Sequence, residues 1–139
     1  MSLTGKEIVL GVTGSIAAYK AVELLRELTK AGAGVRVVLT ESARQFVAPL
    51  TFATLSRREV MTELFTLDYD SRIRHIAATE GADLLLVAPA TANVIAKFAR
   101  GLANDLLTNL FLASTRPVLL APAMDADMYR HPAVQENLE

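Results

Sequence analysis

A short apolar run, a loop with two small residues and a helical pattern follow one another in residues 8–30, IVLGVTGSIAAYKAVELLRELTK. Residues 8–12 are uniformly apolar, which is typical of a parallel strand covered on both faces. From residue 17 to 30 the apolar side chains recur at helical spacing, with charged side chains between them. We therefore expect strand, loop and helix in direct succession.

The same alternation continues along the chain. Further strands are expected at residues 35–40, 84–90 and 118–121, and further helices at 93–100 and 105–114. Alternating strands and helices predict βαβ units, and hence an α/β protein with a doubly wound, Rossmann-like or flavodoxin-like parallel sheet in a three-layer αβα arrangement. Residues 60–65 fit a strand or a helix about equally.

The composition limits the class of protein. The chain has 139 residues, enough for one domain with its own core, of which 52% are apolar and 21% charged. This balance argues against disorder, and it suggests apolar surface that a partner subunit or a flat cofactor covers.

Several function classes become improbable on charge and residue content. The net charge is −1, from 14 basic and 15 acidic residues, without the basic footprint that nucleic-acid binding leaves. Cysteine is absent, which excludes disulfides and thiolate chemistry within these residues. The longest apolar run, 84–90, is too short for a bilayer. We expect a small-molecule substrate, no nucleic acid or membrane partner, no metal and a cytoplasmic location.

The first loop carries glycine and serine between a strand and a helix. Gly14 allows close approach of a ligand to the backbone, and Ser15 is able to cap the helix. Free N–H groups at a helix start favour a phosphate, although a plain turn with a capping serine fits equally well. The position at the carboxyl end of a strand favours the phosphate.

Two later strands end in similar loops. Residues 88–93 read APATAN, where small side chains leave room for a flat ring and Thr91 and Asn93 offer polar groups, unless they serve only as helix caps. Residues 122–128 read PAMDADM, whose methionines suit core packing and whose aspartates suit capping. Side by side in a parallel sheet, the three loops would form one crevice.

The chain has two histidines. His75 precedes a helix-like segment that leads into the 84–90 strand, and its pKa near neutrality would suit proton transfer, although a lone histidine is more often structural. His131 stands before Pro132 in an expected surface turn, so we interpret it as structural.

Together these motifs resemble the homo-oligomeric flavin-containing cysteine decarboxylases. Residues 14–20, GSIAAYK, are similar to the first FMN loop of that family, and His75-Ile76 match its active-site histidine. Residues 88–93 resemble its Pro-Ala-Ser-Ala-Asn motif, and 101–108, GLANDLLT, the stretch that follows. Residues 122–128 resemble Pro-x-Met-Asn-x-x-Met. The order and spacing agree over nearly the whole chain.

The resemblance implies an FMN site and its residues. Those implied to contact FMN are Gly14, Ser15, Ile16, Thr40, Thr91, Ala92, Asn93, Val94 and Ala123. His75 is implied to transfer protons and Asp125 to bind substrate. The family forms trimers, often assembled further, with FMN between subunits.

The implied reaction is FMN-dependent decarboxylation of 4′-phosphopantothenoylcysteine to 4′-phosphopantetheine, a step of coenzyme A biosynthesis. Flavin oxidation of the thiol side gives a thioaldehyde, which accepts the electrons that the departing CO₂ leaves. Two alternatives are decarboxylation of a peptide's C-terminal cysteine and a non-catalytic FMN-binding regulatory subunit.

The sequence departs from the family pattern in two respects. Position 125 is Asp125 where the motif has asparagine, and an ionised aspartate would repel a substrate carboxylate that an amide would bind. The expected domain, residues 4–139, also lacks the cysteine-bearing flap found further along in the family. A ligase domain, present in bifunctional relatives, is likewise outside these residues.

Overall fold

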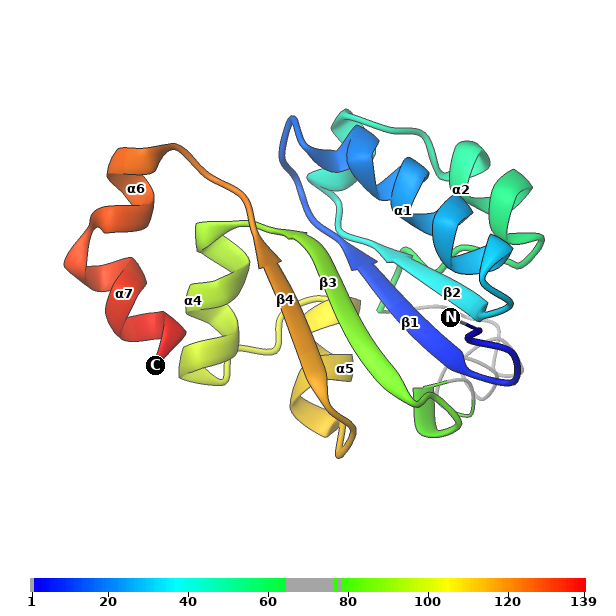
Figure 1. Ribbon diagram of the computed structural model, residues 1–139. Coiled ribbons are helices and arrows are strands. Elements are labelled where there is room, and N and C mark those ends of the chain that lie inside the picture. The colour runs from blue at the N-terminus through cyan, green and yellow to red at the C-terminus, as the bar shows by residue number, and fades with distance from the viewer. Residues whose placement is uncertain (1, 65–76, 78) are drawn as a thin grey trace.

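The computed structural model describes residues 2–64, 77 and 79–139 as a four-stranded parallel sheet flanked by helices (Figure 1). The strands are β1 (Glu7–Val12), β2 (Gly34–Leu39), β3 (Leu84–Ala90) and β4 (Val118–Pro122), in the order β2-β1-β3-β4. All three pairings are parallel. The predicted doubly wound α/β fold is confirmed, and all four predicted strands form within two residues of their expected bounds.

The three predicted helices also form, as α1 (Ala18–Lys30), α4 (Ala92–Arg100) and α5 (Leu106–Ala113). The sequence reading missed the following elements: α2 (Pro49–Ser56), α6 (Ala126–Arg130), α7 (Pro132–Leu138) and the 3-10 helix η1 (Ala43–Gln45). The elements η1, α6 and α7 are seven residues or shorter, so each offers too few turns for a helical period to stand out. Helix α2 has eight residues, of which only Phe52 is buried, so it lacks a continuous apolar stripe. The undecided segment at 60–65 is described to Leu64. It contains only an isolated bridge, between Met61 and Val38.

Alternate strand residues point to opposite faces of the sheet, so the molecule has two apolar cores. On one face Leu10 and Val37 pack with Leu25 of α1 and Phe52 of α2. On the other face, the core consists of strand residues Val9, Val38, Leu85 and Val87 with Ile95 and Phe98 of α4 and Leu107 of α5. The uniformly apolar strands are explained by these two helical layers.

The strand order reverses between β1 and β3. From β1 the chain passes to β2 on one side, and after β2 it crosses to β3 on the other side. In open α/β sheets this switch point leaves a crevice outside the carboxyl ends of the strands, where ligands bind. Sheet topology alone therefore places the expected site beside the loops that follow β1 and β3.

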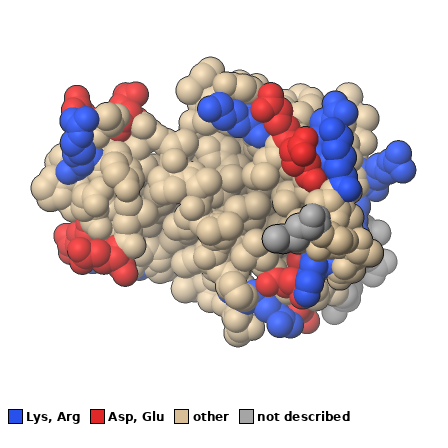
Figure 2. Space-filling model, in the orientation of Figure 1, with Lys and Arg blue, Asp and Glu red and all other residues tan. Residues whose placement is uncertain are grey.

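The β4 edge is the least covered part of the sheet. Val118 is 36% exposed and Leu119 55% exposed, although both are apolar. In the face drawn in Figure 2, charged side chains gather toward the two ends, and the middle of the face carries few of them. Among the described residues, no helix has the length and apolar character needed to cross a membrane.

A bidentate ion pair fixes the amino-terminal end of the sheet, opposite the crevice. Arg58 Nη1 and Nη2 donate to the two carboxylate oxygens of Glu7 at 2.6 and 3.1 Å. A Cβ added at Gly34 would overlap this pair, which explains the glycine at the start of β2. Hydrogen bonds from Arg58 lower the pKa of the Glu7 carboxyl below its usual range.

We predict that Arg58→Met lowers the free energy of unfolding at pH 7 by about 1 kcal/mol, since the pair is partly exposed. Because the folded-state pKa of Glu7 is depressed, its contribution is complete above the ordinary glutamate pKa and disappears as the pH falls through the lowered value. Urea unfolding at a series of pH values should show the difference between wild type and variant shrinking with acidity. Arg26→Met, on the exposed side of α1, is the control, and an equal loss there would contradict the assignment.

Candidate functional site

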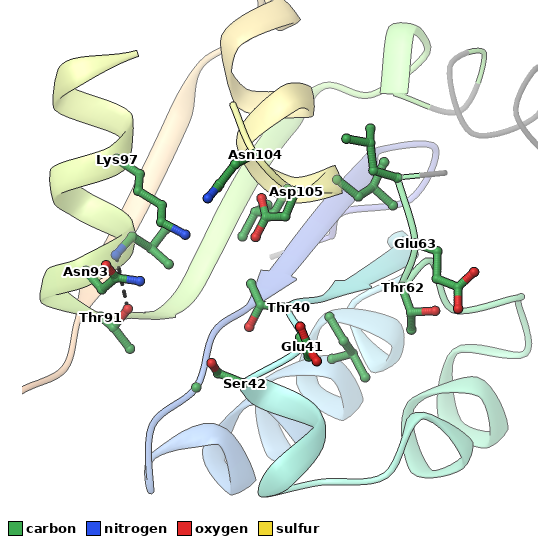
Figure 3. A pocket seen from close by; sticks show the side chains of 16 residues that line it. Thr40, Glu41, Ser42, Thr62, Glu63, Thr91, Asn93, Lys97, Asn104 and Asp105 are labelled. Atoms are coloured by element: carbon green, nitrogen blue, oxygen red, sulfur yellow. Dashed lines mark hydrogen bonds between the residues drawn. The ribbon is translucent and has the colours of Figure 1, made fainter. Parts of the chain in front are cut away.

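A cavity of about 530 Å³ opens at the carboxyl ends of β1, β2 and β3 (Figure 3). Its size is within the range of small-molecule and cofactor pockets. Five residues predicted as site residues line it: Gly14, Thr40, Thr91, Asn93 and Val94. The topology thus brings together loops that lie up to 80 positions apart in the sequence.

Thr13 fixes the two central loops to each other. Its side chain is fully buried, and Oγ1 donates to the Pro89 carbonyl oxygen at 2.5 Å while accepting from the Thr91 N–H at 3.1 Å. One hydroxyl therefore satisfies a carbonyl and an N–H of the chain that leaves β3. These two hydrogen bonds fix the position of the first loop relative to the start of α4.

The first loop packs closely against the segment that follows β2. A Cβ on Gly14 would overlap Ser42 Cβ and lie 3.0 Å from the Ser42 carbonyl carbon, so only glycine fits. Ser15 Oγ accepts from the Ala17 N–H at 3.1 Å, but the N-cap of α1 is Ala17 itself. Within the part of the chain that the structure describes, the N–H groups of Gly14 and Ile16 have no acceptor. These donors remain available to a ligand.

Thr40 directly follows β2 and lines the cavity. It is 8% exposed, and its Oγ1 accepts from the Ala43 N–H at 3.1 Å, which starts η1. The hydroxyl is thus a structural acceptor, while its O–H remains a potential donor toward the cavity.

The start of α4 forms a second wall. Thr91 is the N-cap of this helix and accepts from the Val94 N–H at 3.2 Å, so the capping interpretation is correct for this residue. It lines the cavity nonetheless. Figure 3 shows Asn93 and Lys97 directed from α4 into the cavity, one helical turn apart.

The start of α5 forms a further wall of the cavity. The sequence predicted a helix here but no site residue. Asp105 and Thr108 form a capping box, in which the Thr108 N–H donates to Asp105 Oδ1 at 2.8 Å and the Asp105 N–H to Thr108 Oγ1 at 3.1 Å. Leu107 approaches β1 so closely that a Cβ on Gly11 would lie 2.6 Å from it. The Asp-x-x-Thr spacing was the signal available in the sequence.

The other lining residues come from the end of β2, from irregular segments and from α4 and α5, and no local pattern marked them as site residues. Missed residues are Leu39, Glu41, Ser42, Thr62, Glu63, Leu64, Lys97, Asn104, Asp105, Leu106 and Leu107. Their side chains reach the cavity through tertiary packing, as the view in Figure 3 shows for the labelled ones. Among the residues described, no cluster of His, Cys, Asp or Glu is arranged to hold a metal ion.

Five predicted site residues do not line the cavity. These are Ser15, Ile16, Ala92, Ala123 and Asp125. Ile16 is 77% exposed, and the Ala123 N–H donates to the Ala90 carbonyl oxygen at 3.0 Å, which ties the third loop to the end of β3. Asp125 is exposed at the start of α6, and its side chain makes no capping hydrogen bond. His75 lies outside the described residues.

The third loop and the second histidine settle three lesser expectations. Met124 packs partly buried against the core, as predicted, whereas Met128 is 47% exposed and fills no core. Asp125 stands at the N-cap position of α6, but its side chain does not cap. His131 has the structural role expected, because its Nδ1 accepts from the Ala133 N–H and caps α7.

The fold and the cavity define a class of protein. A parallel sheet with this strand order, hollowed at the point where the order reverses, is the arrangement of flavodoxin-like ligand-binding domains. The chain belongs to the Flavoprotein family, whose model matches residues 1–139.

Sequence relatives agree with this assignment. The chain is 54% identical over 136 residues to the coenzyme A biosynthesis bifunctional protein CoaBC of Bacillus subtilis (strain 168), a match covering 98% of this chain and 34% of that protein. It is 48% identical over 139 residues to CoaBC of Escherichia coli (strain K12), covering 100% and 34%. The chain therefore spans about a third of the length of these curated relatives.

Solved structures with the same fold include two decarboxylases. The FMN-dependent cysteine decarboxylase SpaF superposes with a TM-score of 0.86 at 33% identity, covering 99% of this chain and 79% of that one. A PPC decarboxylase mutant, C175S, complexed with pantothenoylaminoethenethiol, has a TM-score of 0.78 at 30% identity, covering 96% and 75%.

We predict that Thr13→Val destabilises the protein by about 2–3 kcal/mol, because it leaves the Pro89 carbonyl and the Thr91 N–H without their buried partner. Thr13→Ser keeps the hydroxyl and should cost about 1 kcal/mol, for one buried methyl group. Urea unfolding compares the two. Equal losses would show that the methyl, and not the hydrogen bonds, carries the effect.

Proposed function

We propose that this chain is the FMN-binding domain of an enzyme that decarboxylates 4′-phosphopantothenoylcysteine to 4′-phosphopantetheine in coenzyme A biosynthesis. The observation that carries the proposal is the cavity at the β1/β3 switch point, whose lining includes Gly14, Thr40, Thr91, Asn93 and Val94. Support also comes from relatives named for coenzyme A biosynthesis and from a neighbour that is a PPC decarboxylase.

The residues present fit FMN. Close packing at Gly14 leaves two backbone N–H donors, of Gly14 and Ile16, at the amino end of α1, where the helix dipole favours a phosphate. Ser15 and Ile16 would complete that end of the site. Asn93 and Val94 would meet the ring, with Ala92 and Ala123 beside them, and Thr40 would hydrogen-bond between the two ends.

The bound flavin would supply two-electron redox chemistry at the cysteine side of the substrate. The chain's own residues bind and orient the substrate and move its protons. His75 is proposed as the proton-transfer residue. Asp125 is proposed to bind substrate, since its exposed carboxyl makes no hydrogen bond to any described residue. A Michaelis constant unchanged by Asp125→Ala would contradict that role.

We also propose that the protein works as a homotrimer or a trimer-based assembly in the cytoplasm. The exposed apolar residues of β4, Val118 and Leu119, support a subunit contact, because apolar edge strands in soluble proteins are usually covered. A monomer by light scattering at micromolar concentration, with FMN bound, would contradict the assembly.

Two measurements test the proposed function: the identity of the bound cofactor and the release of CO₂ from the substrate. The purified protein should carry FMN at one per chain, identified after release, and the full-length protein should release CO₂ from 4′-phosphopantothenoylcysteine. A peptide ending in cysteine is the competing substrate, because a second neighbour with a TM-score of 0.87 is the cysteine decarboxylase TvaF from thioviridamide biosynthesis. Bound FMN without CO₂ from either substrate would favour a non-catalytic subunit, and no FMN binding would contradict the proposal.

We predict that His75→Asn binds FMN with unchanged affinity and loses at least about 100-fold in decarboxylation rate, the usual contribution of a general acid or base. The matched control is His131→Asn. His131 caps α7 and does not line the cavity, and asparagine is a good capping residue, so this variant should keep its activity. Full activity in His75→Asn would exclude the proton-transfer role.

A further inference from the structure

The cavity contains a lysine whose charge has no partner among the described residues. Lys97 lies on the second turn of α4, is half-buried, and points into the cavity beside Asn93 (Figure 3). Among the described lining residues it is the one cation. Its side chain makes no ion pair or hydrogen bond to the described part of the chain.

The charged side chains near Lys97 either have other partners or are exposed to solvent. Arg100, one turn further along α4, pairs with Glu136 of α7 at 3.6 Å. The Asp105 carboxylate accepts from the Thr108 N–H and hydroxyl at 2.8 and 2.6 Å, so the capping box occupies it. The other lining carboxylates, Glu41 and Glu63, are exposed to solvent. The ammonium group of Lys97 is thus available to an anion inside the cavity.

The first loop and the α4 wall offer separate places for negative charge, and this separation indicates which anion Lys97 meets. Phosphate donors gather at the first loop, where the Gly14 and Ile16 N–H groups lack acceptors among the described residues. Lys97 instead projects from the α4 wall, with Asn104 across the cavity from it (Figure 3). With a phosphate at the first loop, the ring of the proposed cofactor would extend toward the α4 and α5 walls, which line the rest of the cavity.

We infer that Lys97 holds the negative charge that the flavin ring acquires on reduction, and thereby raises the reduction potential of the bound cofactor. Two-electron reduction with uptake of one proton leaves the ring with one negative charge. A cation at its edge stabilises that state over the neutral oxidised ring. This inference rests on the proposed function, because it requires FMN in the cavity.

Lys97→Met tests the inference by equilibrium redox titration of the FMN-loaded protein. It should weaken binding of reduced relative to oxidised FMN by about tenfold, which for a two-electron couple is a fall of about 30 mV in potential. Lys97→Arg keeps the charge and should retain most of the potential. Lys6→Met removes an exposed lysine at the opposite end of the sheet and should leave the potential unchanged.

Affinities for oxidised FMN and for riboflavin, measured by fluorescence quenching, separate the ring from the phosphate. Both should change by less than about threefold in Lys97→Met, because the oxidised ring is neutral. A loss of FMN affinity without loss of riboflavin affinity would place Lys97 at the phosphate and overturn the inference. So would an unchanged potential. Wild-type protein that binds no FMN would overturn the proposed function itself.

Discussion

The hydroxyl group of Thr13 is the contact on which the site depends. At the switch point β1 and β3 are neighbouring strands, but the helices that follow them, α1 and α4, cover opposite faces of the sheet, so the two connecting loops diverge. Thr13 limits that divergence by bonding both the Pro89 carbonyl and the Thr91 N–H from full burial. The same residue therefore closes the sheet beneath the cavity and sets where α4 begins.

Close packing around this contact shapes the remaining walls. Gly14 lets the first loop lie against Ser42, and Gly11 lets Leu107 of α5 lie against β1. A side chain at Gly14 would overlap Ser42 and its backbone, whereas one at Gly11 would displace the Leu107 side chain. The cavity is consequently bounded by helix starts and strand ends, where backbone groups are left without intrahelical partners and remain available to a ligand.

The polar side chains at the starts of α4 and α5 are divided between capping the helices and facing the cavity. Structural hydrogen bonds consume the polar groups of Thr91 and Asp105, which cap α4 and α5. Asn93 and Lys97 have no such task and face the cavity (Figure 3). On these two helices, therefore, the side chains that cap are distinct from the side chains left to meet a ligand.

The sequence by itself determined the alternation of strands and helices, because apolar runs and helical spacing are local patterns, and it pointed to Gly14, Thr40, Thr91, Asn93 and Val94. It could not show that Thr91 is both cap and lining residue, since one hydroxyl suits both. Tertiary structure alone brought Glu41, Glu63 and Lys97 to the same cavity, because these residues lie tens of positions apart in the sequence and share no local pattern. Local periodicity encodes which faces are buried, whereas the packing of distant loops decides which exposed polar groups meet.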